Sequence, residues 1–309
     1  MLISPDKMPR IKLHHLRHFI AIASQGSLHG AARSLGLAQP ALTKGLRELE
    51  EEMGISLVKR HSHGVDLTEA GQQLLTRATS ILEDLRRAQE EANELKGLHI
   101  GEVTVGLSPT VQVMLLPEAY QQFAHDYPEV RLQIVEAKYP AVCQNLADGS
   151  MDFFVGENMG RSLDRHFQAD KWWSSELVVA LRKGHPLAGA TDLALLLDQR
   201  WLCMGLGSDV DDLLAELFTA RGLRIPTGIT VSNSALAFHV LTVYADSDAL
   251  HLVPKPMMEL PCAKGRMVIL PLKEKLPGQD VLFIRRSGVP LTPVAERFAS
   301  LLHRAYRYC

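Results

Sequence analysis

The sequence predicts a mainly helical head, a long linking helix and an α/β region divided into two lobes. Three observations carry this prediction. Short apolar stripes at helical spacing, separated by glycines, occupy residues 13–53. A heptad of apolar residues runs from Leu74 to Leu95. From Ile100 onward, segments typical of strands alternate with segments typical of helices.

The head begins with an apolar stripe over residues 13–24, which predicts a first helix. Gly26 ends that helix, and Ser27 is a suitable N-cap for an alanine-rich second helix over residues 28–35. Three short helices joined by tight turns make a helix-turn-helix core, and the third is predicted next.

Pro40 suits the first turn of the third helix, which is expected to run to about Met53 with leucines inward and charged residues outward. A short apolar strand over residues 55–60, a turn and a return strand over residues 65–67 then form a wing. We therefore predict an all-α winged helix-turn-helix domain over residues 1–67.

The linking helix is predicted over residues 68–97. Its apolar positions are separated alternately by four and three residues, which is a heptad: Leu74, Ala78, Ile81, Leu85, Ala88, Ala92 and Leu95. A helix of this length spans about 40 Å at 1.5 Å per residue. Such a stripe favours pairing with a second copy. The alternative is that the helix lies on its own C-terminal domain.

The α/β region is predicted over residues 98–309. Its order indicates one lobe over residues 98–170 with 276–309 and a second over residues 171–275. Residues 171–181 are expected to form a strand pair or a crossing strand. Two α/β lobes, with the chain returning to the first at its end, predict a periplasmic-binding-protein-like domain.

Composition narrows the class of protein. Apolar residues make up 46% and charged residues 22%, as in folded globular proteins. No apolar run is long enough for a membrane helix and no secretory signal is recognisable, so we expect a cytoplasmic protein without a membrane partner. The four cysteines are far apart, which argues against a zinc site or a disulfide framework. Up to Asp66 the net charge is about +3, which favours an anionic partner for the head.

The predicted helices and strands contain a set of residues that resembles the LysR-type transcriptional regulators over essentially the whole chain. The resemblance rests on Phe19, Gly26-Ser27, Ala31-Ala32, Leu35, Gln39 to Thr43, Leu46, Leu49 to Gly54 and Leu67 to Gly71, and further along on Leu115 to Pro117, Phe123, Tyr127-Pro128, Gly149 to Phe153, His185 to Leu187 and Pro254.

Three positions depart from the family pattern. Ala38 stands where a hydroxyl residue is common, Gly45 lies inside the recognition helix, and Asp246 to Asp248 replace a glycine-rich turn. A glycine within a helix costs about 1 kcal/mol relative to alanine. The first two departures bear on the base contacts and not on the DNA-binding role itself.

The third helix fits a DNA major groove, where its first turns reach base edges. Gln39 can pair with adenine, and Lys44 and Arg47 can reach guanine or phosphate. The wing lies near the flanking backbone. A merely solvated face is the alternative for Lys44 and Arg47 and for the wing histidines, whose spacing also resembles a metal-ligand pair, although no further Cys or His lies close by in sequence. The predicted DNA-binding residues are Ser27, Gln39, Pro40, Ala41, Thr43, Lys44, Arg47, Lys59, Arg60, His61 and His63.

A ligand site is predicted between the two lobes, which the resemblance identifies as the inducer pocket. Hydroxyls and free N–H groups at helix starts bind anions, although simple helix capping is the alternative. We expect a small carboxylate, with aromatic acids among the candidates. The predicted effector-binding residues are Ser108, Pro109, Thr110, Lys138, Gly205, Ser208, Ser232 and Asn233.

The expected partners are double-stranded DNA with a spaced palindromic operator, a carboxylate effector and a second copy bound through the linking helix. The resemblance implies a homotetramer, and RNA polymerase is a further candidate partner. An enzyme is the main rival class, but no nucleophile elbow, zinc-protease motif, P-loop or dinucleotide fingerprint occurs. We predict neither a cofactor nor a metal. A solute-binding protein and a DNA architectural protein are the other rivals.

Overall fold

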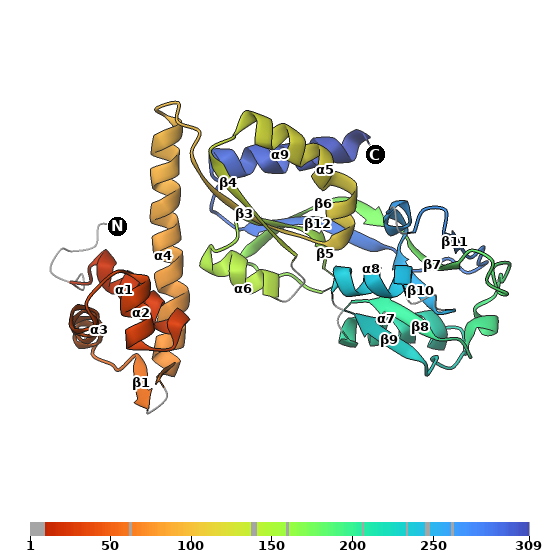
Figure 1. The fold of residues 1–309 in the computed structure, drawn as a ribbon, viewed down its shortest axis with the longest axis horizontal. Helices are drawn as coiled ribbons and strands as arrows, with labels where there is room; N and C mark the ends of the chain where they lie inside the picture. Colours follow the sequence, from red (N-terminus) through yellow and green to blue (C-terminus); the bar gives the residue numbers. More distant parts are fainter. Residues whose placement is uncertain are drawn as a thin grey trace.

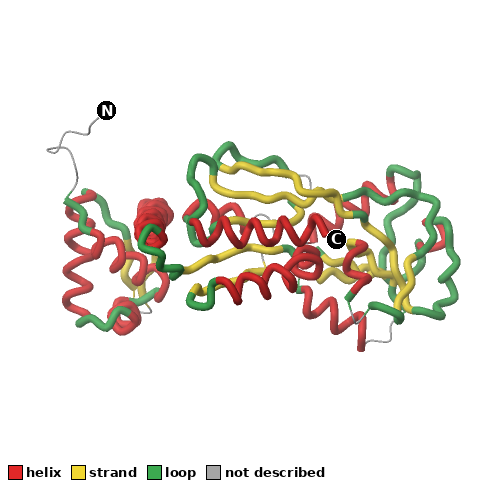
Figure 2. Tube along the Cα trace, turned by 90° about the horizontal axis from the view of Figure 1, so that it is seen from above, coloured by secondary structure: helices red, strands yellow, loops and turns green. Residues whose placement is uncertain are grey.

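The computed structural model describes residues 10–61, 64–136, 141–158, 161–205, 207–232, 234–244, 248–260 and 263–308. The head, the long helix α4 and the two lobes follow one another in a row (Figures 1 and 2). Within the described residues, no helix combines the length and the apolar character needed to cross a bilayer.

The head consists of three helices and a two-stranded wing: α1 (Leu13–Gln25), α2 (Leu28–Ser34), α3 (Gln39–Met53), β1 (Val58–His61) and β2 (Gly64–Leu67). Its core joins fully buried side chains from α1 and α3, among them Phe19, Leu42 and Leu46. Ser27 caps α2 by accepting a hydrogen bond from the N–H of Gly30 at 3.1 Å. The head therefore has the arrangement of elements that the glycine-separated stripes predict.

The linking helix α4 (Glu69–Glu94) begins at the predicted cap, where the Thr68 hydroxyl accepts from the N–H of Gly71 at 3.0 Å. One part of the heptad prediction needs correction. Leu74 packs against the core of the head and Ala78 is buried in it, so the chain covers the start of the stripe. The remainder, from Ile81 to Leu95, is largely exposed.

The first lobe is a five-stranded sheet in the order β4-β3-β5-β12-β6. The strands are β3 (Gly101–Leu107), β4 (Val130–Glu136), β5 (Phe153–Glu157), β6 (Phe167–Ser175) and β12 (Gln279–Arg286). Strand β3 runs parallel to β4 and β5, whereas β12 is antiparallel to β5 and β6. The helices are α5 (Pro109–Asp126), α6 (Ala141–Asp148) and α9 (Pro293–Tyr308), and α5 and α9 pack together over the sheet (Figure 1).

The second lobe is a five-stranded sheet in the order β11-β7-β10-β8-β9. Its strands are β7 (Leu177–Arg182), β8 (Trp201–Met204), β9 (Ile229–Ser232), β10 (Leu250–Pro254) and β11 (Met267–Ile269). The helical segments are η2 (Leu193–Leu196), α7 (Gly207–Thr219), α8 (Ala235–Tyr244) and η3 (Lys255–Glu259). Trp201 and Phe218 are fully buried in its core and meet edge to face at 5.5 Å.

The predicted change of lobe at residue 171 needs correction, because it falls inside β6. That strand pairs with β12 from Phe167 to Ser175 and therefore belongs to the first sheet as a whole. The chain enters the second lobe at β7, after Glu176. The run over residues 171–181 thus contains the end of one strand and most of another, in different sheets.

Candidate DNA-binding and effector sites

Helix α3 presents its predicted DNA-binding residues to solvent. Leu42, Leu46 and Leu49 are fully buried, so the opposite face is turned outward. Gln39, Pro40, Ala41, Lys44 and Arg47 are exposed and Thr43 is half-buried. Pro40 occupies the first turn, where its missing N–H costs no helical hydrogen bond.

The two cations of α3 have partners within the same helix. Lys44 Nζ lies 3.7 Å from a carboxylate oxygen of Glu48, and Arg47 Nε lies 2.6 Å from one of Glu51. The side chains of Lys44 and Arg47 are 78% and 79% exposed. Exposed pairs of this kind contribute little to stability, so phosphate can replace the carboxylates at small cost.

Gly45 has a packing role that explains its departure from the family pattern. A Cβ at this position would lie 2.4 Å from Nδ1 of His18 and 3.2 Å from Cε1 of the same ring. The absence of a side chain therefore lets the imidazole from α1 lie directly against α3. That Nδ1 is buried without a hydrogen-bond partner in the part of the chain that the structure describes. Burial lowers the pKa of His18, which favours the neutral ring.

A second histidine joins the same two helices. His15 Nε2 lies 3.1 Å from a carboxylate oxygen of Glu48, and the N–H of Lys12 donates to His15 Nδ1 at 3.3 Å. His14, His15 and Glu48 offer possible ligand atoms within 4.8 Å of one another. Because both ring nitrogens of His15 are already engaged, we interpret this cluster as a contact between α1 and α3. Sequence reasoning missed this contact.

The wing projects the predicted cations outward and is attached to the turn before α2. Lys59, Arg60 and His61 are exposed, and His61 Nε2 lies 3.2 Å from a carboxylate oxygen of Asp66. The N–H of Val65 donates to the carbonyl of Gly26 at 2.8 Å. A Cβ at Gly64 would lie 2.4 Å from that carbonyl oxygen, so this close approach requires glycine. His63 lies outside the described residues.

The linking helix has a second, polar face that packs on the first lobe. Arg87 Nη2 lies 3.2 Å from Oδ1 of Asp152, which is almost fully buried, and Arg86 Nη2 lies 3.7 Å from the same atom. Arg286 of β12 pairs with Asp84 at 2.6 Å and donates to the Ser80 hydroxyl at 2.9 Å. These residues fix α4 to the first lobe.

Burial and pairing act in opposite directions on this contact. Burial raises the pKa of Asp152, and Arg87, the N–H of Thr104 and Arg86 counteract that rise. Burial likewise lowers the pKa of Arg87, against the attraction of Asp152. Sequence reasoning missed this network, although the run of charged residues on α4 opposite the heptad is a signal that could have found it.

In the first lobe, the predicted effector loop is the start of α5. The Ser108 hydroxyl accepts from the N–H of Val111 at 3.4 Å, and its own N–H donates to the carbonyl of Val155 at 3.0 Å. Ser108, Pro109 and Thr110 are all buried. A few residues on, Val113 packs against a cluster of the second lobe that includes Leu202 and Met257. The start of α5 therefore lies at the junction of the lobes.

In the second lobe, two predicted loops lie together. The N–H of Gly205, after β8, donates to the carbonyl of Ser232, at the end of β9, at 3.0 Å. The Ser232 hydroxyl bonds to the backbone of Ser234 ahead of α8. Lys138 and Asn233 lie outside the described residues, as does the side chain of Ser208.

A helix-turn-helix head with an exposed basic recognition face, joined by a long helix to two α/β lobes, defines a DNA-binding regulator with a ligand-binding type of domain.

Two family profiles match the chain: "Bacterial regulatory helix-turn-helix protein, lysR family" over residues 13–72, and "LysR substrate binding domain" over residues 96–307. The chain therefore belongs to the LysR family of DNA-binding transcriptional regulators. This confirms the resemblance, the fold class and the prediction of a regulator rather than an enzyme.

Its relatives include the HTH-type transcriptional regulator GbpR of Azospirillum brasilense, 29% identical over 96% of this chain and 87% of that protein. The regulator YdcI of Escherichia coli K12 is 30% identical over 90% of each chain. Among solved structures, a full-length OxyR variant from Pseudomonas aeruginosa has a TM-score of 0.69 at 22% identity and covers 97% of this chain and 96% of its own. Full-length CbnR complexed with its target DNA has a TM-score of 0.66 at 21% identity and covers 95% and 99%. At these identities the two structures support the fold alone.

Proposed function

We propose that the protein binds a spaced palindromic operator, with α3 in the major groove and the wing on the flanking backbone. The observation that carries the proposal is the exposed face of α3, where Gln39, Lys44 and Arg47 stand free of the core. Gln39 would pair with adenine, and the two cations would contact guanine or phosphate. Thr43, Ser27 and the wing cations Lys59, Arg60 and His61 would add contacts, with His63 beyond the wing turn.

The palindrome follows from pairing of two chains through α4. The exposed stripe from Ile81 and Leu85 to Leu95 has its final leucine 90% exposed, and the opposite face of the helix already packs on the first lobe. Two chains joined along this stripe would hold two recognition helices about one DNA turn, or a multiple of it, apart. Further contacts between lobes would give the homotetramer, and RNA polymerase is a candidate contact on the bound DNA. Such a regulator acts on chromosomal DNA in the cytoplasm.

Footprinting on the DNA upstream of the protein's own gene, with the solution mass measured alongside, tests this proposal. We expect two spaced protected half-sites and a mass of four chains. The variant Leu85→Glu should lower the mass and remove the paired footprint, whereas Leu195→Glu, at an exposed leucine of the second lobe, should change neither. Protection that stays non-specific and is lost with salt would contradict the proposal.

We further propose that a small organic acid, with aromatic acids among the candidates, binds between the lobes. Support comes from the buried start of α5 at the lobe junction and from the adjoining loops at Gly205 and Ser232. Backbone N–H groups and hydroxyls at helix starts suit a carboxylate. Ser108, Pro109 and Thr110 would hold it from one lobe, and Gly205, Ser208, Ser232 and Asn233 from the other, with Lys138 supplying charge.

Calorimetry with a panel of carboxylates tests the cleft. Thr110→Val keeps the shape of the side chain and removes its hydroxyl, so it should weaken binding by about tenfold. The control Thr219→Val removes an exposed hydroxyl of α7 that donates to the carbonyl of Ala215 in the same helix. Equal affinity in the Thr110 variant and the control would refute the assignment.

A further inference from the structure

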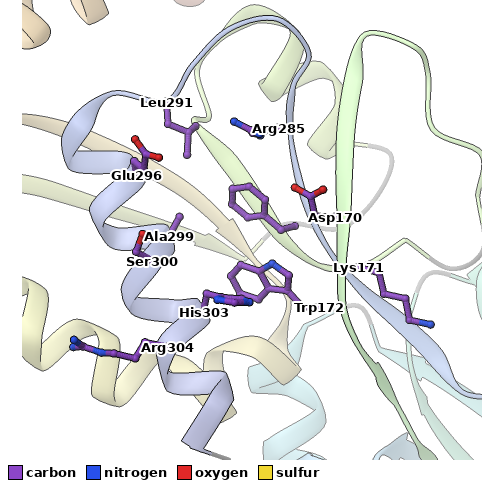
Figure 3. Close-up of a pocket in the computed structure, with 11 residues that line it drawn as sticks. Asp170, Lys171, Trp172, Arg285, Leu291, Glu296, Ala299, Ser300, His303 and Arg304 are labelled. Atoms are coloured by element: carbon purple, nitrogen blue, oxygen red, sulfur yellow. The ribbon is translucent and has the colours of Figure 1, made fainter.

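The first lobe carries a groove that is separate from the proposed effector cleft. It lies between α9 and the strands β6 and β12 and has a volume of about 660 Å³, within the range of small-molecule pockets (Figure 3). Its lining residues come from β6, β12, the turn at Leu291 and α9. None of them belongs to the loops assigned to the effector.

A bulge in the edge strand shapes the apolar wall of this groove. Trp173 pairs with Val281 and Lys171 pairs with Leu282, so Trp172 is the extra residue in the strand. A bulge interrupts the alternation of side chains between the two faces of a sheet. Trp172 and Trp173 are therefore both directed to the face that α9 covers. Trp172 stacks parallel to Phe283 at 5.5 Å and meets His303 edge to face at 5.0 Å. Trp173 stacks on Tyr306 instead.

One nitrogen of Arg285, in the wall of the groove, has no hydrogen-bond partner within the described part of the chain. Arg285 lies on the same face of β12 as Phe283, and its Nε is buried without a hydrogen-bond partner among the described residues. A buried donor left unsatisfied is unfavourable, and an ionised carboxylate is the strongest acceptor for a guanidinium. Arg285 also lines the groove, so its guanidinium is the group to which we assign the carboxylate of a ligand.

The other cations near the groove are placed differently. Lys171 pairs with Asp280 at 2.7 Å, and Figure 3 shows both Lys171 and Arg304 directed away from the centre of the groove. The acids Asp170 and Glu296 also line the groove and are exposed, and Asp170 lies directly opposite Phe283 in the sheet. Their charge disfavours a ligand with more than one negative charge, although water screens it.

We propose that this groove is a second ligand site, which binds a singly charged aromatic carboxylate. The carboxylate bonds to Arg285, and the ring packs against Trp172 and Phe283. The site is independent of the effector cleft, so its test does not depend on the function proposed above. Since successive side chains alternate along β12, Arg285 faces the groove while Arg286 holds Ser80 and Asp84 of α4. A ligand on Arg285 thus binds next to the anchor of the linking helix.

The experiment uses 4-fluorobenzoate observed by fluorine NMR, with the full chain carrying Thr110→Val so that the cleft is impaired. We expect saturable line broadening in this protein, and binding weaker by at least about tenfold once Arg285→Gln is added. The control Arg297→Gln, which removes an exposed arginine of α9 that does not line the groove, should leave the affinity unchanged. Circular dichroism confirms that each variant is folded.

Two results would overturn the proposal: no saturation up to about 5 mM in the Thr110→Val protein, or equal affinity with and without Arg285→Gln. Should the glutamine variant not fold, Arg285→Lys retains the charge and removes the Nε donor. Affinity unchanged in that variant would overturn the proposal equally. Calorimetry on Thr110→Val tests the effector cleft, and adding Arg285→Gln to that variant tests the groove. One of the two proposals can therefore fail while the other holds.

Discussion

Helices α3 and α4 carry the same kinds of charged residue in opposite settings. On α3, Lys44 and Arg47 are nearly four-fifths exposed and pair with acids four residues further along the same helix. On α4, the side chains of Arg86 and Arg87 are 27% and 7% exposed, and both lie near Asp152 of the first lobe.

The location of the partner separates the two roles. A cation paired within its own exposed helix can exchange its carboxylate for a DNA phosphate, because water already solvates both groups. A buried cation cannot leave its partner without leaving a buried charge unpaired. On α3, Lys44 and Arg47 therefore stay accessible to an incoming anion, while α4 uses its arginines to hold the first lobe. Movement of that lobe accordingly carries α4 with it.

The largest expected effect is at the junction. Arg87→Ala leaves Asp152 buried without its nearest cation and should destabilise the lobes by about 3–5 kcal/mol. All three tryptophans, Trp172, Trp173 and Trp201, lie in the lobes, so urea unfolding followed by tryptophan fluorescence reports this loss.

The matched control is Lys264→Ala, which breaks an exposed pair with Glu259 and should stay within about 0.5 kcal/mol of the unsubstituted protein. Similar losses in the two variants would remove the distinction between buried and exposed pairs on which the comparison depends.

A buried histidine should make the lobes sensitive to acid. Burial lowers the pKa of His251, in β10, to about 4. The unfolded chain therefore takes up this proton near pH 6.5, before the folded one does, and stability falls as the pH drops from about 6.5 to about 4. The full loss is about 3 kcal/mol.

Unfolding by urea at a series of pH values measures this slope. His251→Val should flatten it over that interval, whereas His125→Ala, which removes an exposed pair with Asp126 at a side chain that is 85% exposed, should change it far less. An equally steep acid slope in the His251 variant would assign the sensitivity to other groups.

The elements of the head could be predicted because their signals are local. Glycine turns, the Ser27 and Thr68 caps and the apolar spacing each act within a few residues. The division between the lobes was displaced because β6 has no break at residue 171, and only its pairing with β12 assigns it to the first sheet.

The remaining features depend on contacts between distant segments. Arg87 meets Asp152, His18 fills the space at Gly45, and the bulge at Trp172 exists only in the register with β12. Helical spacing also does not show whether a stripe is covered, so the packing of Leu74 and Ala78 on the head could not be predicted from the heptad. The predicted DNA and effector contacts remain predictions.

The substitution Gly45→Ala should change stability less than the two changes above. Its sign should be opposite to the one that intrinsic helix preference predicts. Alanine should favour an exposed helix by about 1 kcal/mol, but its Cβ would lie 2.4 Å from His18 Nδ1. We therefore expect Gly45→Ala to destabilise the head by about 1–3 kcal/mol. Thermal unfolding of the double variant His18→Ala with Gly45→Ala should recover most of that loss. A stabilised single variant would show that the ring moves aside freely.

The smallest expected effect on stability is on the exposed face of α3. Lys44→Ala should change the free energy of unfolding by no more than about 0.5 kcal/mol, since its partner Glu48 is already solvated and retains His15. If Lys44 contacts a phosphate, the slope of log affinity against log salt should fall by about one, equally for operator and unrelated DNA. If it contacts guanine, binding to the operator should lose affinity while binding to unrelated DNA should not.

The mobility-shift titration at several salt concentrations is repeated with Lys264→Ala as the control. Both variants remove one exposed lysine, but only Lys44 lies on α3. A Lys44 variant that keeps both its slope and its operator preference would place this cation outside the DNA contact and leave Arg47 as the cation of α3 for the same test.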